Sequence, residues 1–103
     1  MDWNTEDNKR LIDAILSLKT PEEAQHFLRD LMTENEIKEF TKRLSAAIML
    51  ANEMPYSEIK KQTGISSTTV ARVSLWLNKS EDGYKNIIKK LNNRVSVPQM
   101  KKD

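Results

Sequence analysis

The sequence contains no cysteine and only one histidine, His26. Without cysteine there is no disulfide framework, no thiolate metal site and no thiol nucleophile. A single histidine has no second nitrogen or sulfur ligand with which to hold zinc, and a glycine-rich phosphate loop is also absent. We therefore expect no metal site, no bound cofactor and no catalytic residues, and we do not expect an enzyme.

Glycine and proline are also scarce, with 2 and 3 copies in 103 residues. Helix-forming residues dominate the rest, and no segment alternates apolar and polar residues long enough to predict a strand, so the fold class is all-α. No apolar run approaches the ~20 residues that span a bilayer. The acidic, polar N-terminus does not resemble a signal peptide. We expect a cytoplasmic protein with no membrane partner.

The net charge of +2 conceals an uneven distribution of charge along the chain. Residues 1–55 carry 7 basic and 11 acidic side chains, whereas residues 56–103 carry 10 basic and 4 acidic ones. Such segregation favours a polyanionic partner for the second half, although a solvated basic tail would give the same count.

The pattern of apolar residues predicts about six helices. Thr20-Pro21-Glu22-Glu23 and Thr33-Glu34-Asn35-Glu36 are typical helix starts, with threonine as the N-cap and glutamate at the third position. Residues 44–51 are apolar nearly all round, which predicts a buried helix. We expect residues 1–93 to form one helical domain and residues 94–103 to form a disordered basic tail. The first expected helix runs from Asn4 or Thr5 to about Leu18. The others cover residues 21–31, 34–51, 56–62, 67–77 and 81–92, the last with Ser80 as its cap.

Residues 56–77 have the pattern of a helix-turn-helix, in which two short helices cross over a tight turn. Gly64 supplies the residue that accepts a left-handed backbone in that turn. The two helices need a small apolar cluster to hold them together, and either Ser66 or Ser67 is expected to cap the second helix. The expected cluster consists of Ile59, Ile65, Val70 and Val73.

The second helix, residues 67–77, presents small and hydroxyl-bearing side chains. Small side chains allow a helix to enter a DNA groove, hydroxyls bond phosphates or base edges, and a helix N-terminus favours phosphate. Basic residues beside this face are expected to contact phosphates or bases. The predicted DNA-binding residues are Tyr56, Ser57, Lys60, Lys61, Ser66, Ser67, Thr68, Thr69, Ala71 and Arg72. A helix-turn-helix hairpin used only for packing is the alternative interpretation.

These residues and the helices before them resemble the Trp repressor superfamily, and within it the YerC/YecD group of Trp-repressor-related proteins. The similarity spans about residues 11–92. A basic pair in the long central helix, Lys42-Arg43, occurs together with Arg72 in the second helix of the motif. Further markers are the segments 15–18, 27–31, 33–37, 42–44 and 56–73.

The resemblance implies an intertwined homodimer of five or six helices per chain. It implies that two reading helices enter successive major grooves of a near-palindromic operator, about 34 Å apart. On this interpretation the protein is a sequence-specific transcriptional regulator, a repressor, whose partner is double-stranded DNA. The alternative is a helix-turn-helix module used for protein contact or for non-specific nucleic-acid binding.

The resemblance also implies a ligand site beside the reading helix. In the Trp repressor two arginines enclose the tryptophan; one corresponds to Arg72, and the other falls on Lys42, with Arg43 beside it. A lysine cannot stack flat on a ring as a guanidinium does, and Val73 and Trp76 replace smaller residues there. We therefore expect no tryptophan corepressor, and either an amino-acid-like carboxylate effector or none. The alternative role for Lys42 and Arg43 is an ion pair with a nearby acidic residue.

Overall fold

The computed structural model describes residues 1–79 and 81–96, and all regular secondary structure in these segments is helical. The helices form two compact units, Met1–Ile37 and Lys38–Asp103. The six-helix, all-α expectation is confirmed. In chain order the helices are α1 (Glu6–Leu16), α2 (Pro21–Leu31), α3 (Glu34–Ala51), α4 (Tyr56–Thr63), α5 (Ser67–Lys79) and α6 (Gly83–Ser96).

Threonine side chains start the helices of the first unit, as the sequence predicts. Thr20 Oγ1 accepts a hydrogen bond from the Glu23 amide at 3.1 Å, and the Glu23 carboxylate accepts one from the Lys19 amide. At the start of α3 the exchange is reciprocal, because Thr33 Oγ1 accepts from the Glu36 amide while the Glu36 carboxylate accepts from the Thr33 amide. Each exchange satisfies backbone donors that a helix start leaves without partners.

The first unit has apolar side chains but no core of its own. Neither α1 nor α2 contains a buried residue. On α1 the side chains of Leu11, Ile12, Ile15 and Leu16 form a stripe that is 38–74% exposed. A helix with such a stripe normally buries it against another element.

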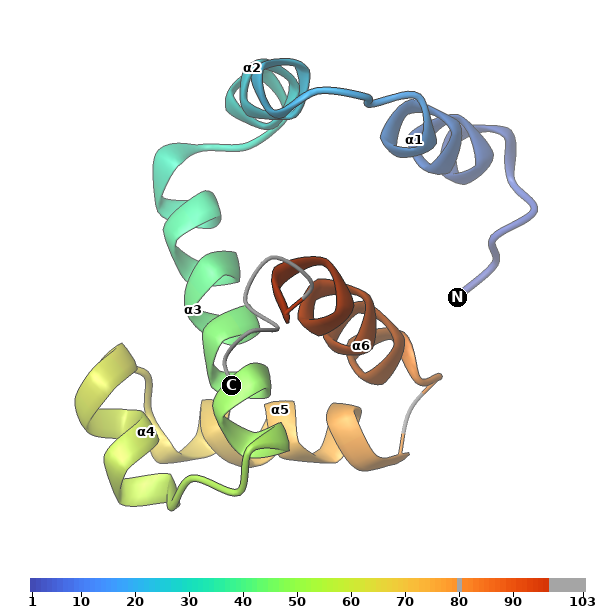
Figure 1. Ribbon diagram of the computed structural model, residues 1–103. Coiled ribbons are helices and arrows are strands. Elements are labelled where there is room, and N and C mark those ends of the chain that lie inside the picture. The colour runs from blue at the N-terminus through green and yellow to red at the C-terminus, as the bar shows by residue number, and fades with distance from the viewer. Residues whose placement is uncertain (80, 97–103) are drawn as a thin grey trace. The chain divides into compact units, whose positions relative to one another are not determined.

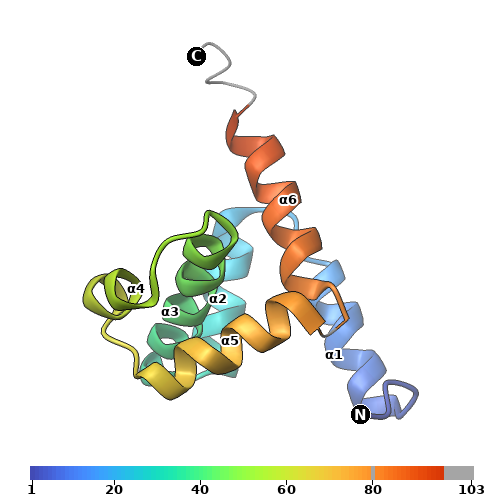
Figure 2. The same cartoon turned by 90° about the horizontal axis from the view of Figure 1, so that it is seen from below.

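The second unit contains the core of the described chain. Four helices contribute to it, with Ala46 and Ala47 of α3 fully buried, as expected for the apolar end of that helix. Figures 1 and 2 show α4 and α5 joined by a tight turn beside the C-terminal end of α3, with α6 next to α5. The remaining core residues are Ile59, Ile65, Val70, Val73, Leu77 and Ile88.

The predicted helix boundaries are wrong by a few residues at several ends. The first helix ends at Leu16, where the Ser17 backbone closes the last turn, and α5 continues two residues past its expected end, to Lys79. The last helix begins at Gly83, directly after Asp82, whose left-handed backbone with φ 65° interrupts the helical path. It ends at Ser96, so residues 94–96 of the predicted tail are helical. Ser80 and residues 97–103 lie outside the described residues.

Among the described residues no helix combines the length and the apolar character needed to cross a membrane.

Candidate nucleic-acid interface

The turn between α4 and α5 has the geometry that the sequence predicts. The first helix of the pair begins after Pro55, whose fixed φ suits a helix start. It ends at Gly64, which has a left-handed backbone with φ 77°, and the Gly64 amide donates to the Lys60 carbonyl at 2.8 Å. This geometry turns the chain sharply, and it favours glycine because a β-carbon is strained at this φ.

An apolar cluster holds the two helices together, and it consists of the four predicted residues. Ile59, Val70 and Val73 are fully buried, and Ile65 is 7% exposed. Because these residues come from α4, the turn and α5, their burial fixes the angle at which the helices cross. The exposed surface of α5 is therefore carried on a rigid support.

Thr63 contributes a second connection across the turn that the sequence analysis did not identify. Its hydroxyl donates to the Ile59 carbonyl at 2.7 Å and accepts a hydrogen bond from the Ile65 amide at 3.3 Å. One hydroxyl thus joins the last turn of α4 to the residue that enters the core after Gly64. The sequence signal for this role is weak, because a threonine before a helix-ending glycine does not by itself indicate that its hydroxyl bridges the turn.

Ser66 is the residue that caps α5, rather than Ser67. Its Oγ accepts a hydrogen bond from the Thr69 amide at 3.1 Å and lies 3.0 Å from the Thr69 hydroxyl. The first turn of α5 contains no acidic residue. The positive end of the helix dipole is therefore not neutralised by a side chain of its own first turn.

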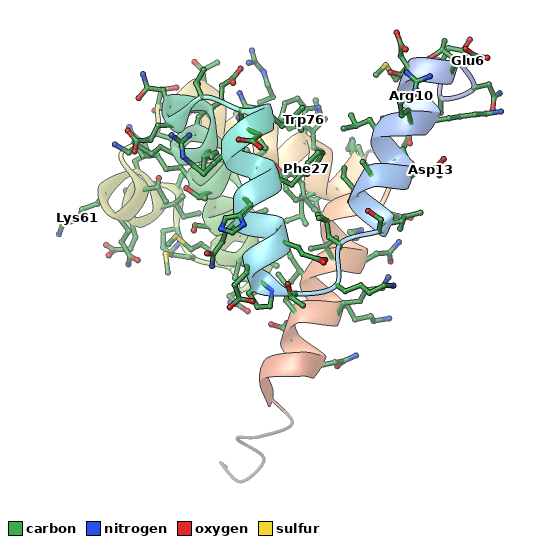
Figure 3. All side chains as sticks on the ribbon, turned by 90° about the horizontal axis from the view of Figure 1, so that it is seen from above. Glu6, Arg10, Asp13, Phe27, Lys61 and Trp76 are labelled. Atoms are coloured by element: carbon green, nitrogen blue, oxygen red, sulfur yellow. The ribbon has the colours of Figure 1, made fainter. Side chains whose placement is uncertain are left out.

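Nearly all of the predicted DNA-binding residues are exposed to solvent. Nine of the ten are exposed, and Thr69 is half-buried. Lys60 and Lys61 lie in the last turn of α4, and Figure 3 shows Lys61 extending away from that helix. The other exposed residues are Tyr56 and Ser57 on α4, Ser66 in the turn, and Ser67, Thr68, Ala71 and Arg72 on α5.

The hollow that Lys42 lines does not include the other two predicted ligand-binding residues, Arg43 and Arg72. Lys42 lines a hollow of about 230 Å³ between α3 and α4, and Arg72 is not among its lining residues. Val73, which was expected to crowd the ligand position, is part of the core. The hollow is lined by Thr41, Lys42, Ser45, Met49, Gln62 and Thr63.

Arg43 interacts mainly with neighbours on its own helix. Its Nε lies 3.7 Å from a Glu39 carboxylate oxygen, close enough for an ion pair but too far for a hydrogen bond. The guanidinium carbon lies 5.4 Å from the centre of the Phe40 ring, a cation–π distance. Burial raises the pKa of the Tyr84 phenol, and the positive charge of Arg43 offsets part of that rise. For Arg43 the structure contains the predicted alternative, an ion pair with a nearby acidic residue.

Three comparisons relate this chain to known proteins. The family model described as Trp repressor protein matches residues 6–92. The chain is 43% identical over 75 residues to the uncharacterized protein YerC of Bacillus subtilis (strain 168). The aligned residues make up 73% of this chain and 72% of that protein.

Two solved structures are similar to this chain. One is a TrpR-like protein from Eubacterium eligens ATCC 27750, with a TM-score of 0.83, 38% identity, and coverage of 86% of this chain and 92% of that chain. The other is a chain from Staphylococcus aureus, with a TM-score of 0.83, 34% identity, and coverage of 89% and 95%.

Proposed function

We propose that this chain, which belongs to the Trp repressor family, is a transcriptional regulator that binds a near-palindromic DNA operator as a homodimer. Membership of this family points to a regulator that binds DNA rather than to an enzyme. We further propose that the binding is sequence-specific, that the complex with DNA has two-fold symmetry, and that the protein acts as a repressor.

One observation carries the proposal, namely three hydrogen-bonding side chains that have no partner among the described residues. Among the described residues, the Ser67 and Thr68 hydroxyls and the Arg72 guanidinium form no hydrogen bond or ion pair with the protein. All three are exposed on the first half of α5. Hydroxyls and guanidinium groups are the side chains that read base edges and hold phosphates, so this surface is suited to a major groove.

The charge around this surface supports the same partner. Lys60 and Lys61 lie in the last turn of α4, on the helix that precedes the reading helix. The acidic residue of α4, Glu58, is half-buried and accepts a hydrogen bond from the Gln62 amide group at 2.9 Å. Positive charge beside a helix N-terminus whose first turn contains no acidic residue attracts the phosphate backbone of DNA.

The homodimer is supported by the exposed apolar stripe of the first unit. A helix such as α1, with no buried residue in its own chain, gains stability when a second chain covers it. Exposed apolar residues also occur in the second unit, where Leu75 is 54% exposed and Trp76 is 36% exposed. A two-fold dimer would cover such surfaces in both chains and would present two copies of α5 to DNA.

We further propose that the effector is a small carboxylate, such as an amino acid. Lys42 supplies the ammonium group, in the hollow that it lines with Ser45 and Gln62. This hollow lies between α3 and α4, so a bound ligand would touch the helix that supports the reading helix.

The test is a selection of genomic DNA fragments by the purified protein at two salt concentrations, with and without an amino-acid mixture. Enriched fragments that share a two-fold symmetric sequence are the expected result. Binding of all fragments alike would favour non-specific nucleic-acid binding. Binding of none would favour a module for protein contact, with only the fold shared with DNA-binding relatives.

A further inference from the structure

A second hollow lies in the second unit, on residues that take no part in the proposed DNA interface. It has a volume of about 370 Å³ and is bounded by the C-terminal end of α3, the second half of α5 and the first turn of α6. These segments lie together in both views of the ribbon (Figures 1 and 2). Its apolar lining comes from Leu50, Ala51 and the buried Leu77.

One wall of this hollow is formed by a glutamate with an unfavourable backbone. The third helix ends with the Glu53 amide bonded to the Leu50 carbonyl at 2.9 Å and the Met54 amide bonded to the Met49 carbonyl at 3.0 Å. The residue at the Glu53 position of such a helix end is usually glycine, because its backbone is left-handed. Glu53 has φ 64° there, which costs about 1 kcal/mol for a residue with a β-carbon.

The charges of the hollow are separated between two elements. Glu53 and the carbonyl end of the α3 dipole make the α3 side negative. Lys85, in the first turn of α6, supplies a positive charge. Both side chains are exposed, and the two do not approach within the 4.0 Å of an ion pair. Leu50, Ala51 and Leu77 add apolar surface to the lining, and Ser74 and Asn78 add hydrogen-bonding groups, so the hollow combines a negative side chain, a positive side chain and a mixed lining.

We propose that this hollow binds a small zwitterion whose two charges lie at opposite ends of a short apolar chain, that is, an ω-amino acid. Its carboxylate would pair with the Lys85 ammonium, and its ammonium with the Glu53 carboxylate and the last carbonyls of α3. Its methylene groups would cover Leu50 and Leu77. An α-amino acid carries both charges on one carbon and spans a shorter distance than an ω-amino acid, so a series of increasing chain length tests the separation that the hollow requires. This inference concerns binding alone and does not depend on DNA binding.

The test is a titration of the ¹⁵N-labelled full chain, followed by two-dimensional NMR, with a series of ligands of increasing length. The series is glycine, 3-aminopropanoate, 4-aminobutanoate, 5-aminopentanoate and 6-aminohexanoate, with butylamine, butanoate and L-leucine as comparison ligands. The amide signals of Ser74, Asn78 and Lys85 report on the hollow. We expect these signals to shift with an affinity that peaks within the series, and to respond weakly to the three comparison ligands.

Two pairs of variants separate a binding site from a general electrostatic effect. Lys85→Gln should weaken the best ligand about tenfold, whereas Lys89→Gln, one turn further along α6, should leave its affinity unchanged. Glu53→Asn removes the charge with a residue that tolerates the left-handed backbone, and it should weaken binding similarly. Glu81→Gln, outside the hollow, should have no effect.

Three results would overturn the proposal. The first is the absence of shifts at these amides with every member of the series. The second is equal binding of butylamine, butanoate or L-leucine, which would show that separated charges are not required. The third is equal loss of affinity in Lys85→Gln and Lys89→Gln, which would indicate attraction to the positive charge of α6 as a whole. None of these results bears on whether the protein binds DNA.

Discussion

The hydroxyl oxygens of Ser66 and Thr69 lie 3.0 Å apart at the start of α5, and Ser66 Oγ also accepts a hydrogen bond from the Thr69 amide. This pair divides the run of four hydroxyl residues into two kinds. Ser66 and Thr69 bond each other and hold the helix start, whereas Ser67 and Thr68 have no hydroxyl partner among the described residues. The first pair therefore has a structural role, and the second pair is the one that we propose for contact with DNA.

We predict that Ser66→Ala lowers the free energy of unfolding by about 1 kcal/mol, because an N-cap is lost. Ser66→Asn, which keeps a capping oxygen, should recover most of this stability. The measurement is urea denaturation followed by circular dichroism. Equal stability of the alanine variant and the wild type would show that Ser66 does not cap α5 in solution.

We predict that Thr63→Val lowers the free energy of unfolding by about 1 kcal/mol, because its hydroxyl bridges the Ile59 carbonyl and the Ile65 amide. Valine has nearly the same shape, so the change removes the hydrogen bonds and little else. Thr63→Ser keeps the hydroxyl and is the matched control. If the serine variant loses more stability than the valine variant, packing of the Thr63 methyl group, not the bridge, is what matters.

We predict that substitutions of Gly64 destabilise the protein in the order valine, alanine, asparagine, with the loss at alanine about 1–2 kcal/mol. A β-carbon at this position would meet no atom within 4 Å, so the cost arises from the backbone φ of 77° and not from a clash. Gly83→Ala is the control, because that glycine has no positive φ and a β-carbon there also meets open space. A loss at Gly83 as large as that at Gly64 would contradict this explanation.

The sequence predicted those parts of the fold that depend on local chemistry. Thr20 and Thr33 cap helices as expected, and Gly64 adopts the left-handed backbone that its place in the motif requires. The four-residue cluster of the helix-turn-helix was predictable because the spacing of its members places them on facing surfaces. Here a local pattern and the tertiary contacts indicate the same structure.

Less could be predicted where the structure depends on partners distant in sequence. Leu75 and Trp76 are large apolar residues of α5, and both are substantially exposed in this chain. Helical periodicity shows that a side chain is apolar but not which surface covers it. Lys42 and Arg72 lie far apart in sequence, so only packing decides whether they meet, and the hollow that Lys42 lines does not include Arg72.

We predict that the chain sediments as a dimer and that Ile15→Glu on α1 shifts it toward a monomer. Ile15 is 47% exposed within its own chain, so a charge there costs little unless a second chain covers it. Lys9→Glu, an exposed polar position on the same helix, is the control and should leave the dimer intact. Wild-type protein that sediments as a monomer at micromolar concentration would contradict the proposed homodimer.

The central claim is that the exposed half of α5 reads DNA, and the most direct measurement is the affinity of Arg72→Ala for the selected DNA site. Fluorescence anisotropy over a range of salt concentrations should show a loss of about 1–3 kcal/mol relative to wild type. Arg10→Ala, an exposed arginine of α1 paired with Asp7, should bind as the wild type does. Wild-type affinity and salt dependence in Arg72→Ala would contradict the assignment of α5 as the reading helix.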